Sequence, residues 1–145
     1  MQGPAKINDQ LSVAGQITKD EIAVLANQGF ATIINNRPDN EEPGQLGQEA
    51  AKAEAEARGL RYFYQPVTTP TITKAAVVAF QNALLRAPKP ILAYCRSGTR
   101  CYLMWGLTRT VLGRESPLQI VAQAAHQGFD IRALPALTEK LQAEK

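Results

Sequence analysis

An α/β fold with a mainly parallel central sheet flanked by helices is predicted by two features of the sequence. Short apolar, β-branched runs alternate with helical segments along the chain, an order typical of a parallel sheet covered on both faces. The apolar run 91–94 leads straight into a small-residue loop and a helix, and sites in such folds lie at the carboxyl ends of strands. A chain of 145 residues, 45% of them hydrophobic, can bury one core, so we expect a single domain.

The individual elements are predicted from local signals. Residues 7–13 alternate only partly and indicate a short edge strand or an extended arm. Thr18 and Glu21 form a capping box for a helix that Gly29 ends. The remaining elements are expected as strands at 30–34, 61–67 and 91–94, and as helices at 48–58, 74–86, 99–112 and 117–127, with a last short helix after Pro135.

Composition excludes several classes of function. The 16 Lys and Arg against 13 Asp and Glu give a net charge of +3, too small and too dispersed to favour nucleic-acid or membrane binding. Apolar runs stay well below the ~20 residues of a membrane span, and residues 1–6 do not resemble a signal peptide, so we expect a cytoplasmic protein. Two cysteines and one histidine suit neither a disulfide framework nor a zinc site, so neither metal nor cofactor is expected.

Residues 95–100 have the composition of an anion site built around a thiol. A loop that wraps onto a helix N-terminus points unpaired backbone N–H groups inward, where the helix dipole also favours negative charge. Donors and cations around Cys95 would favour its thiolate, the nucleophilic form. We expect Cys95 and Arg100 to be catalytic, although the sequence does not decide which arginine points inward. The expected anion-binding residues lie in the same loop: Arg96, Ser97, Gly98 and Thr99.

Other candidates have weaker signals. Arg37 ends a predicted strand, where it either faces the same rim or braces the next turn. Cys101 either packs as a small residue in the first helical turn or acts as a second redox thiol. His126 has no ligand or nucleophile spacing around it and is interpreted as a surface or packing residue, and Trp105 as helix core. Tyr94 directly precedes the cysteine, but its type alone does not indicate that it tunes the neighbouring thiol.

Three segments carry a family resemblance. Residues 11–16 read LSVAGQ, residues 29–39 run from Gly-Phe to Asn-Asn-Arg-Pro-Asp, and residues 93–100 read AYCRSGTR. Together they resemble the beta-lactamase-hydrolase-like phosphatase family over about residues 7–112. The resemblance implies a cysteine-phosphatase-like fold of the dual-specificity type, and family members are described as sulfur transferases. It also implies a possible partner, a metallo-beta-lactamase-like persulfide dioxygenase domain, to which this chain would be fused or related.

Two features depart from cysteine phosphatases of that fold. Enzymes resembling the tyrosine-specific phosphatases have five residues between cysteine and arginine, which would place arginine at the position of Cys101. Arg100 comes one residue earlier, and the resulting Cys-Arg-Ser-Gly-x-Arg loop resembles that of rhodanese-like sulfurtransferases. Those phosphatases also use an aspartate on the loop after the preceding strand as general acid, whereas residues 67–71 contain no carboxylate. The carboxylates on another loop are interpreted as solvated turn charges: Asp39, Glu41 and Glu42.

These observations predict a thiosulfate or persulfide sulfurtransferase. Sulfane sulfur would move from a small anionic donor, thiosulfate or a low-molecular-weight persulfide, to a thiol or other acceptor through a Cys95 persulfide. The alternative is a phosphatase that forms a phosphocysteine at the same residue. A third interpretation is a non-catalytic anion-binding or redox-sensing domain in which Cys95 and Cys101 form a disulfide or polysulfide.

Overall fold

A twisted sheet lies at the centre of the computed structural model, which describes residues 3–144. The order of its strands is β1-β2-β5-β3-β4; β1 pairs antiparallel with β2, and the other neighbours are parallel. The predicted mainly parallel sheet is therefore confirmed. Its strands are β1 (Ala5–Lys6), β2 (Leu11–Ala14), β3 (Thr32–Asn35), β4 (Arg61–Tyr64) and β5 (Ile91–Tyr94).

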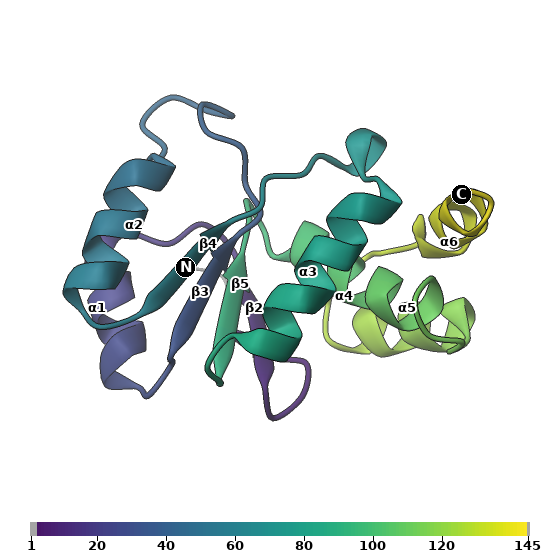
Figure 1. The fold of residues 1–145 in the computed structure, drawn as a ribbon, viewed down its shortest axis with the longest axis horizontal. Helices are drawn as coiled ribbons and strands as arrows, with labels where there is room; N and C mark the ends of the chain where they lie inside the picture. The colour runs from purple at the N-terminus through teal and green to yellow at the C-terminus, as the bar shows by residue number, and fades with distance from the viewer. Residues whose placement is uncertain (1–2, 145) are drawn as a thin grey trace.

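Helices cover both faces of the sheet, as the alternating sequence pattern predicts. The helices of the described residues are α1 (Lys19–Asn27), α2 (Gln48–Ala57), α3 (Lys74–Arg86), α4 (Thr99–Thr110), α5 (Pro117–His126) and α6 (Leu134–Gln142). Figure 1 shows α1 and α2 on one side of the sheet, α3 and α4 on the other, and α5 and α6 beyond α4. Each side has its own core of buried apolar residues.

Helix α4 is the most deeply buried helix of the described residues. Its residues from 101 to 108 are all buried, because α3, α5 and α6 pack around it. Trp105 is 6% exposed and lies in the core, as expected. Across the sheet, Ile22 and Leu25 of α1 pack with Ala51 and Ala55 of α2. No helix within residues 3–144 has the length and apolar character that a membrane span requires.

Three differences between predicted and observed elements have clear physical reasons. Strand β2 is not an edge strand, because the two-residue β1 covers its outer side. Strand β4 ends at Tyr64, two residues before Pro66, which has no N–H to donate to a neighbouring strand. Helix α6 begins at Leu134, so that Pro135 lies within its first turn, where a missing N–H costs nothing.

The carboxyl ends of the parallel strands meet at one edge of the sheet. Asn36 N–H donates to the Tyr94 carbonyl at 2.9 Å, and Gln65 N–H donates to the Asn35 carbonyl at 2.9 Å. Beyond the end of β2, Gln16 N–H donates to a carbonyl of the loop that follows β5, at 3.2 Å. Residues far apart in the sequence are thereby brought together beside Cys95.

Candidate active site

The Cys95 loop connects β5 to α4 and folds tightly around the sulfur. Cys95 is 1% exposed, and the Gly98 N–H donates to its Sγ at 3.1 Å. Gly98 has φ +91°, a left-handed conformation that favours glycine. A Cβ at this position would lie 3.1 Å from Phe129 Cε1 and 3.3 Å from the Ala14 carbonyl carbon, so the loop needs glycine for space as well.

Hydrogen bonds at the sulfur favour the thiolate form of Cys95. They lower its pKa to about 5; the hydrogen bond with the Cys101 side chain is the largest cause and outweighs the opposing effect of burial. Backbone N–H groups of Cys101 and Ser97 and the positive charge of Arg100 act in the same direction. Cys95 is therefore a thiolate at neutral pH, as an attacking cysteine must be.

Cys101 lies in the first turn of α4 and is completely buried. Burial and the neighbouring Cys95 sulfur raise its pKa well above the usual range. It therefore remains a thiol and can donate its S–H to Cys95. Both cysteines are free, so the residue occupies the packed position expected for it, and its redox role stays a prediction.

Arg100 is the arginine that acts on the thiolate. Its side chain is 15% exposed and its charge helps to lower the pKa of Cys95, whereas the Arg96 side chain is 69% exposed. Nη1 of Arg100 donates to the Val67 carbonyl at 2.9 Å. Nη1 and Nη2 also bind the two carboxylate oxygens of Glu41, at 2.8 and 2.7 Å. Among the described residues no partner is bonded to Nε, which leaves that N–H for a substrate oxygen or sulfur.

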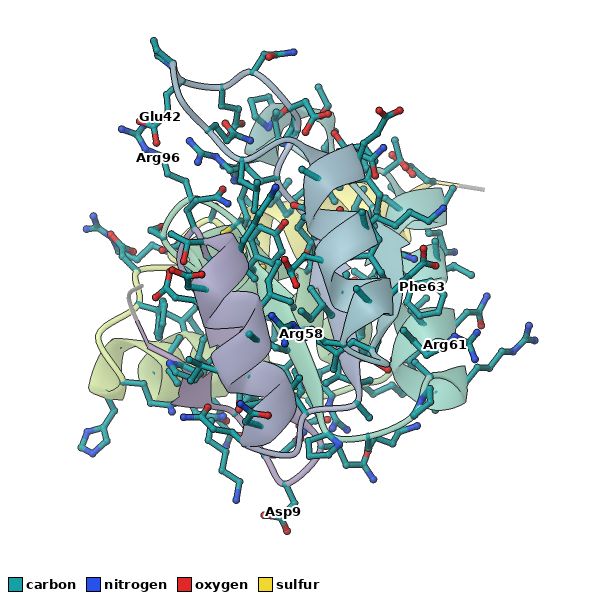
Figure 2. All side chains as sticks on the ribbon, turned by 90° about the vertical axis from the view of Figure 1, so that its left-hand side faces the viewer. Asp9, Glu42, Arg58, Arg61, Phe63 and Arg96 are labelled. Atoms are coloured by element: carbon teal, nitrogen blue, oxygen red, sulfur yellow. The ribbon has the colours of Figure 1, made fainter. Side chains whose placement is uncertain are left out.

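Arg37 is fully buried and binds the same acidic loop. Its Nε donates to Glu41 Oε1 at 2.8 Å, and its Nη1 donates to Gln16 Oε1 at 3.0 Å. Nη2 is 3.2 Å from Glu42 Oε1, and Glu42 Oε2 is 3.9 Å from Arg96 Nη2. Figure 2 shows Glu42 and Arg96 beside each other at this edge of the molecule. Three arginines and two glutamates thus alternate around the cysteine loop.

The interpretation of the acidic loop as solvated turn charges was wrong for two of its three carboxylates. Glu41 joins the buried Arg37 to Arg100, and these partners, Arg100 above all, lower the pKa of Glu41. Asp39 has a structural position, because its Oδ1 accepts the N–H of Gln48 at the start of α2, at 2.8 Å. The contact between Glu41 and Arg100 was missed because it joins residues 59 apart in the sequence.

Ser97 and Thr99 lie in the cysteine loop as expected, whereas the side chains of Tyr94 and His126 lie elsewhere in the fold. Ser97 Oγ donates to Thr99 Oγ1 at 3.1 Å on the exposed side of the loop. Tyr94 is buried in the core on the α1 and α2 side of the sheet, and burial raises its pKa, so its phenol stays neutral. His126 is exposed at the end of α5. Gln16, which binds both Arg37 and the cysteine loop, was not singled out from the sequence.

Comparison with solved structures shows which fold arranges these residues. A candidate phosphatase from Neisseria meningitidis is 34% identical, with a TM-score of 0.84 over 95% of this chain and 97% of that chain. P. aeruginosa TpbA, solved in complex with pTyr, is 17% identical, with a TM-score of 0.70 over 94% of this chain and 86% of that chain. The second likeness concerns the fold alone, and the expected cysteine-phosphatase-like fold is confirmed.

Sequence comparison gives the family. A beta-lactamase hydrolase-like protein of Agrobacterium fabrum is 39% identical over 138 residues, which are 95% of this chain and 32% of that protein. Its counterpart in Xylella fastidiosa is 38% identical over 125 residues, 86% of this chain and 29% of that protein. The chain therefore spans about a third of the length of these relatives. Residues 5–112 match the family described as "Beta-lactamase hydrolase-like protein, phosphatase-like domain", and the chain belongs to this family.

Proposed function

We propose that the chain is a sulfurtransferase in which Cys95 carries sulfane sulfur. The Cys95 thiolate attacks the outer sulfur of thiosulfate, the S–S bond of the donor breaks, and sulfite leaves with the bonding electron pair. An acceptor thiolate then attacks the outer sulfur of the Cys95 persulfide, which returns Cys95 as a thiolate and releases the acceptor as a persulfide. The loop N–H groups and Arg100 support this proposal, because they stabilise negative charge next to the sulfur.

The pairing of Glu41 with Arg37 and Arg100 is the observation on which the proposal depends. A phosphatase needs a protonated acid for its alcohol or phenol leaving group, and general-acid help contributes about 10²–10⁴-fold. Arg100 and Arg37 lower the pKa of Glu41, and Asp39 is committed to the start of α2. Sulfite and thiolates leave as anions and need no proton at neutral pH, so the available groups are sufficient for sulfur transfer.

Phosphate-ester hydrolysis through a phosphocysteine is the second candidate. The comparisons favour it over sulfur transfer, because the matching family is phosphatase-like and several similar solved structures are described as phosphatases. The same thiolate and the same Arg100 would serve this reaction. Without a protonated acid we expect slow turnover of esters whose alcohols are poor leaving groups.

A side-by-side assay distinguishes the two reactions. Thiosulfate turnover and aryl-phosphate hydrolysis are measured on the wild type, and the intact mass is recorded after each substrate. We expect a gain of ~32 Da, one sulfur atom, with negligible phosphate release. Cys95→Ser should abolish the gain, and Lys52→Gln serves as the control, because Lys52 is exposed on α2. Cys95-dependent phosphate release without a sulfur adduct would establish the phosphatase instead.

A further inference from the structure

We propose that a cleft beside the Cys95 loop receives the non-reacting half of a carboxylate-bearing, low-molecular-weight thiol acceptor. The cleft has a volume of about 330 Å³ and lies between residues 16–19, which run from the end of β2 into the start of α1, and residues 42–46, which follow β3. This inference rests on the proposed sulfur transfer and assigns a place to its second substrate. The volume of the cleft is at the lower end of the ~300–1,000 Å³ that is typical of small-molecule sites.

The cleft is joined directly to the residue that follows the nucleophile. Gln16 on one wall donates its N–H to the Arg96 carbonyl at 3.2 Å. Glu42 on the other wall lies 3.9 Å from the Arg96 guanidinium, and Figure 2 shows these two side chains close together. The cleft therefore lies next to Arg96, and we place the non-reacting part of the acceptor there.

The charges on the walls indicate the chemistry of the occupant. The arginines around the cysteine loop are already paired with glutamates. Lys19 is exposed on the cleft wall and forms no ion pair within the described residues, so its charge is available to a substrate carboxylate. Ile17 and Leu46 add apolar surface for the methylene groups of such a molecule. These features favour a peptide-sized thiol with free carboxylates over a neutral thiol.

The transfer step balances without a further reactant. The acceptor thiol loses its proton to solvent, and its sulfur attacks the outer sulfur of the Cys95 persulfide. The bond between Cys95 Sγ and that outer sulfur breaks, and its electron pair stays on Cys95 as the thiolate. In this step Lys19 is a specificity-determining residue, because it contacts the acceptor but not the reacting atoms.

The first experiment compares glutathione with its diethyl ester, which has the same thiol but esterified carboxylates. Protein loaded with sulfur from thiosulfate is mixed with each thiol, and the loss of the persulfide is followed by intact mass. We expect the wild type to prefer glutathione after correction for the thiolate fraction of each thiol. Lys19→Gln should lower that preference by up to about fivefold, the largest effect of one exposed ion pair. Lys52→Gln, an exposed lysine of α2 outside the cleft, is the matched control and should behave as the wild type.

A second measurement separates failure of the cleft from failure of the proposed function. S-methylglutathione, which cannot accept sulfur, is tested for protection of Cys95 against iodoacetamide. Protection that weakens in Lys19→Gln but not in Lys52→Gln supports the cleft even if thiosulfate loads no sulfur, a result that would refute sulfur transfer alone. Sulfur loading with equal thiol preference and equal protection in all three proteins would overturn the cleft and leave the proposed function intact.

Discussion

Replacing Cys101 tests the cause of the low Cys95 pKa. The hydrogen bond from the Cys101 thiol is the largest of the interactions that bring the pKa of Cys95 to about 5. A hydrogen bond to a charged group contributes about 1.5–3 kcal/mol, which corresponds to about one to two pKa units. Cys101→Ala removes the donor, so we expect the Cys95 pKa to rise to ~6–7. Cys101→Ser keeps a donor at the same place and should stay close to the wild type.

The assay is the pH dependence of alkylation of Cys95 by iodoacetamide, read by intact mass between pH 4 and pH 9. Cys101 itself should not react in the folded protein, because it is completely buried and its pKa is raised. Circular dichroism of both variants controls for a change of fold. A midpoint in Cys101→Ala equal to that of the wild type, or a similar rise in both variants, would refute the donor role of the thiol. The alkylation rate does not depend on whether the protein transfers sulfur or phosphate.

Three further predictions concern stability, measured by urea unfolding. The pKa of Cys95 is lowered to about 5 in the folded state and is ~8.5 when unfolded, so ionisation of the thiol stabilises the folded protein. The free energy of unfolding of the wild type should therefore rise by about 1.4 kcal/mol per pH unit relative to Cys95→Ser between pH 5.5 and 8, and this gain should be lost as the pH falls through 5. A difference that does not change with pH would contradict the ionised thiolate. Glu41→Ala removes hydrogen bonds to both the buried Arg37 and Arg100 and should cost about 3 kcal/mol. The half-exposed Glu42 has one close contact with Arg37 and a 3.9 Å contact with the exposed Arg96, so Glu42→Ala should cost less than about 1 kcal/mol. Equal losses would refute the bridging role of Glu41. Gly98→Ala should lose more stability than Gly44→Ala, although both glycines have positive φ. A Cβ added at Gly98 would lie 3.1 Å from its nearest neighbour, whereas one added at Gly44 would have none within 4 Å. Equal losses would show that crowding in the loop is unimportant.

The fold was largely predictable because its signals are local. The capping box formed by Thr18 and Glu21 is present and starts α1, and Gly29 follows its end with φ +99°. Helix α3 has its predicted bounds of 74–86. The two-residue β1 has no comparable signal, because its pairing with β2 depends on a turn and not on a repeated pattern. The strand order was also not predicted, since it depends on packing between distant segments.

The candidate site was predictable only where its residues are contiguous. Cys95, Gly98 and Arg100 lie in one loop, so their types and spacing indicate an anion site. The position of Glu41 follows from packing of the β3–α2 loop against the β5–α4 loop, which no local pattern reports. Gln16 likewise acquires its contacts only when the end of β2 is placed beside β5. Sequence alone therefore identified the candidate nucleophile but not the charges that orient Arg100.

The ionisation states of Glu41 and Cys95 also bear on the choice between the proposed reactions. In both, the covalent intermediate breaks down by departure of the Cys95 thiolate, and a thiol of lower pKa leaves faster. The first steps differ, because an alkoxide or phenoxide leaving group benefits from a proton that sulfite does not need. Arg100 and Arg37 lower the pKa of Glu41 and so favour its ionised form, and hydrogen bonds at the sulfur lower the pKa of Cys95 to about 5. Both shifts favour the charged forms, so the paired arginines disfavour general-acid catalysis by this glutamate, while sulfur transfer requires only the thiolate.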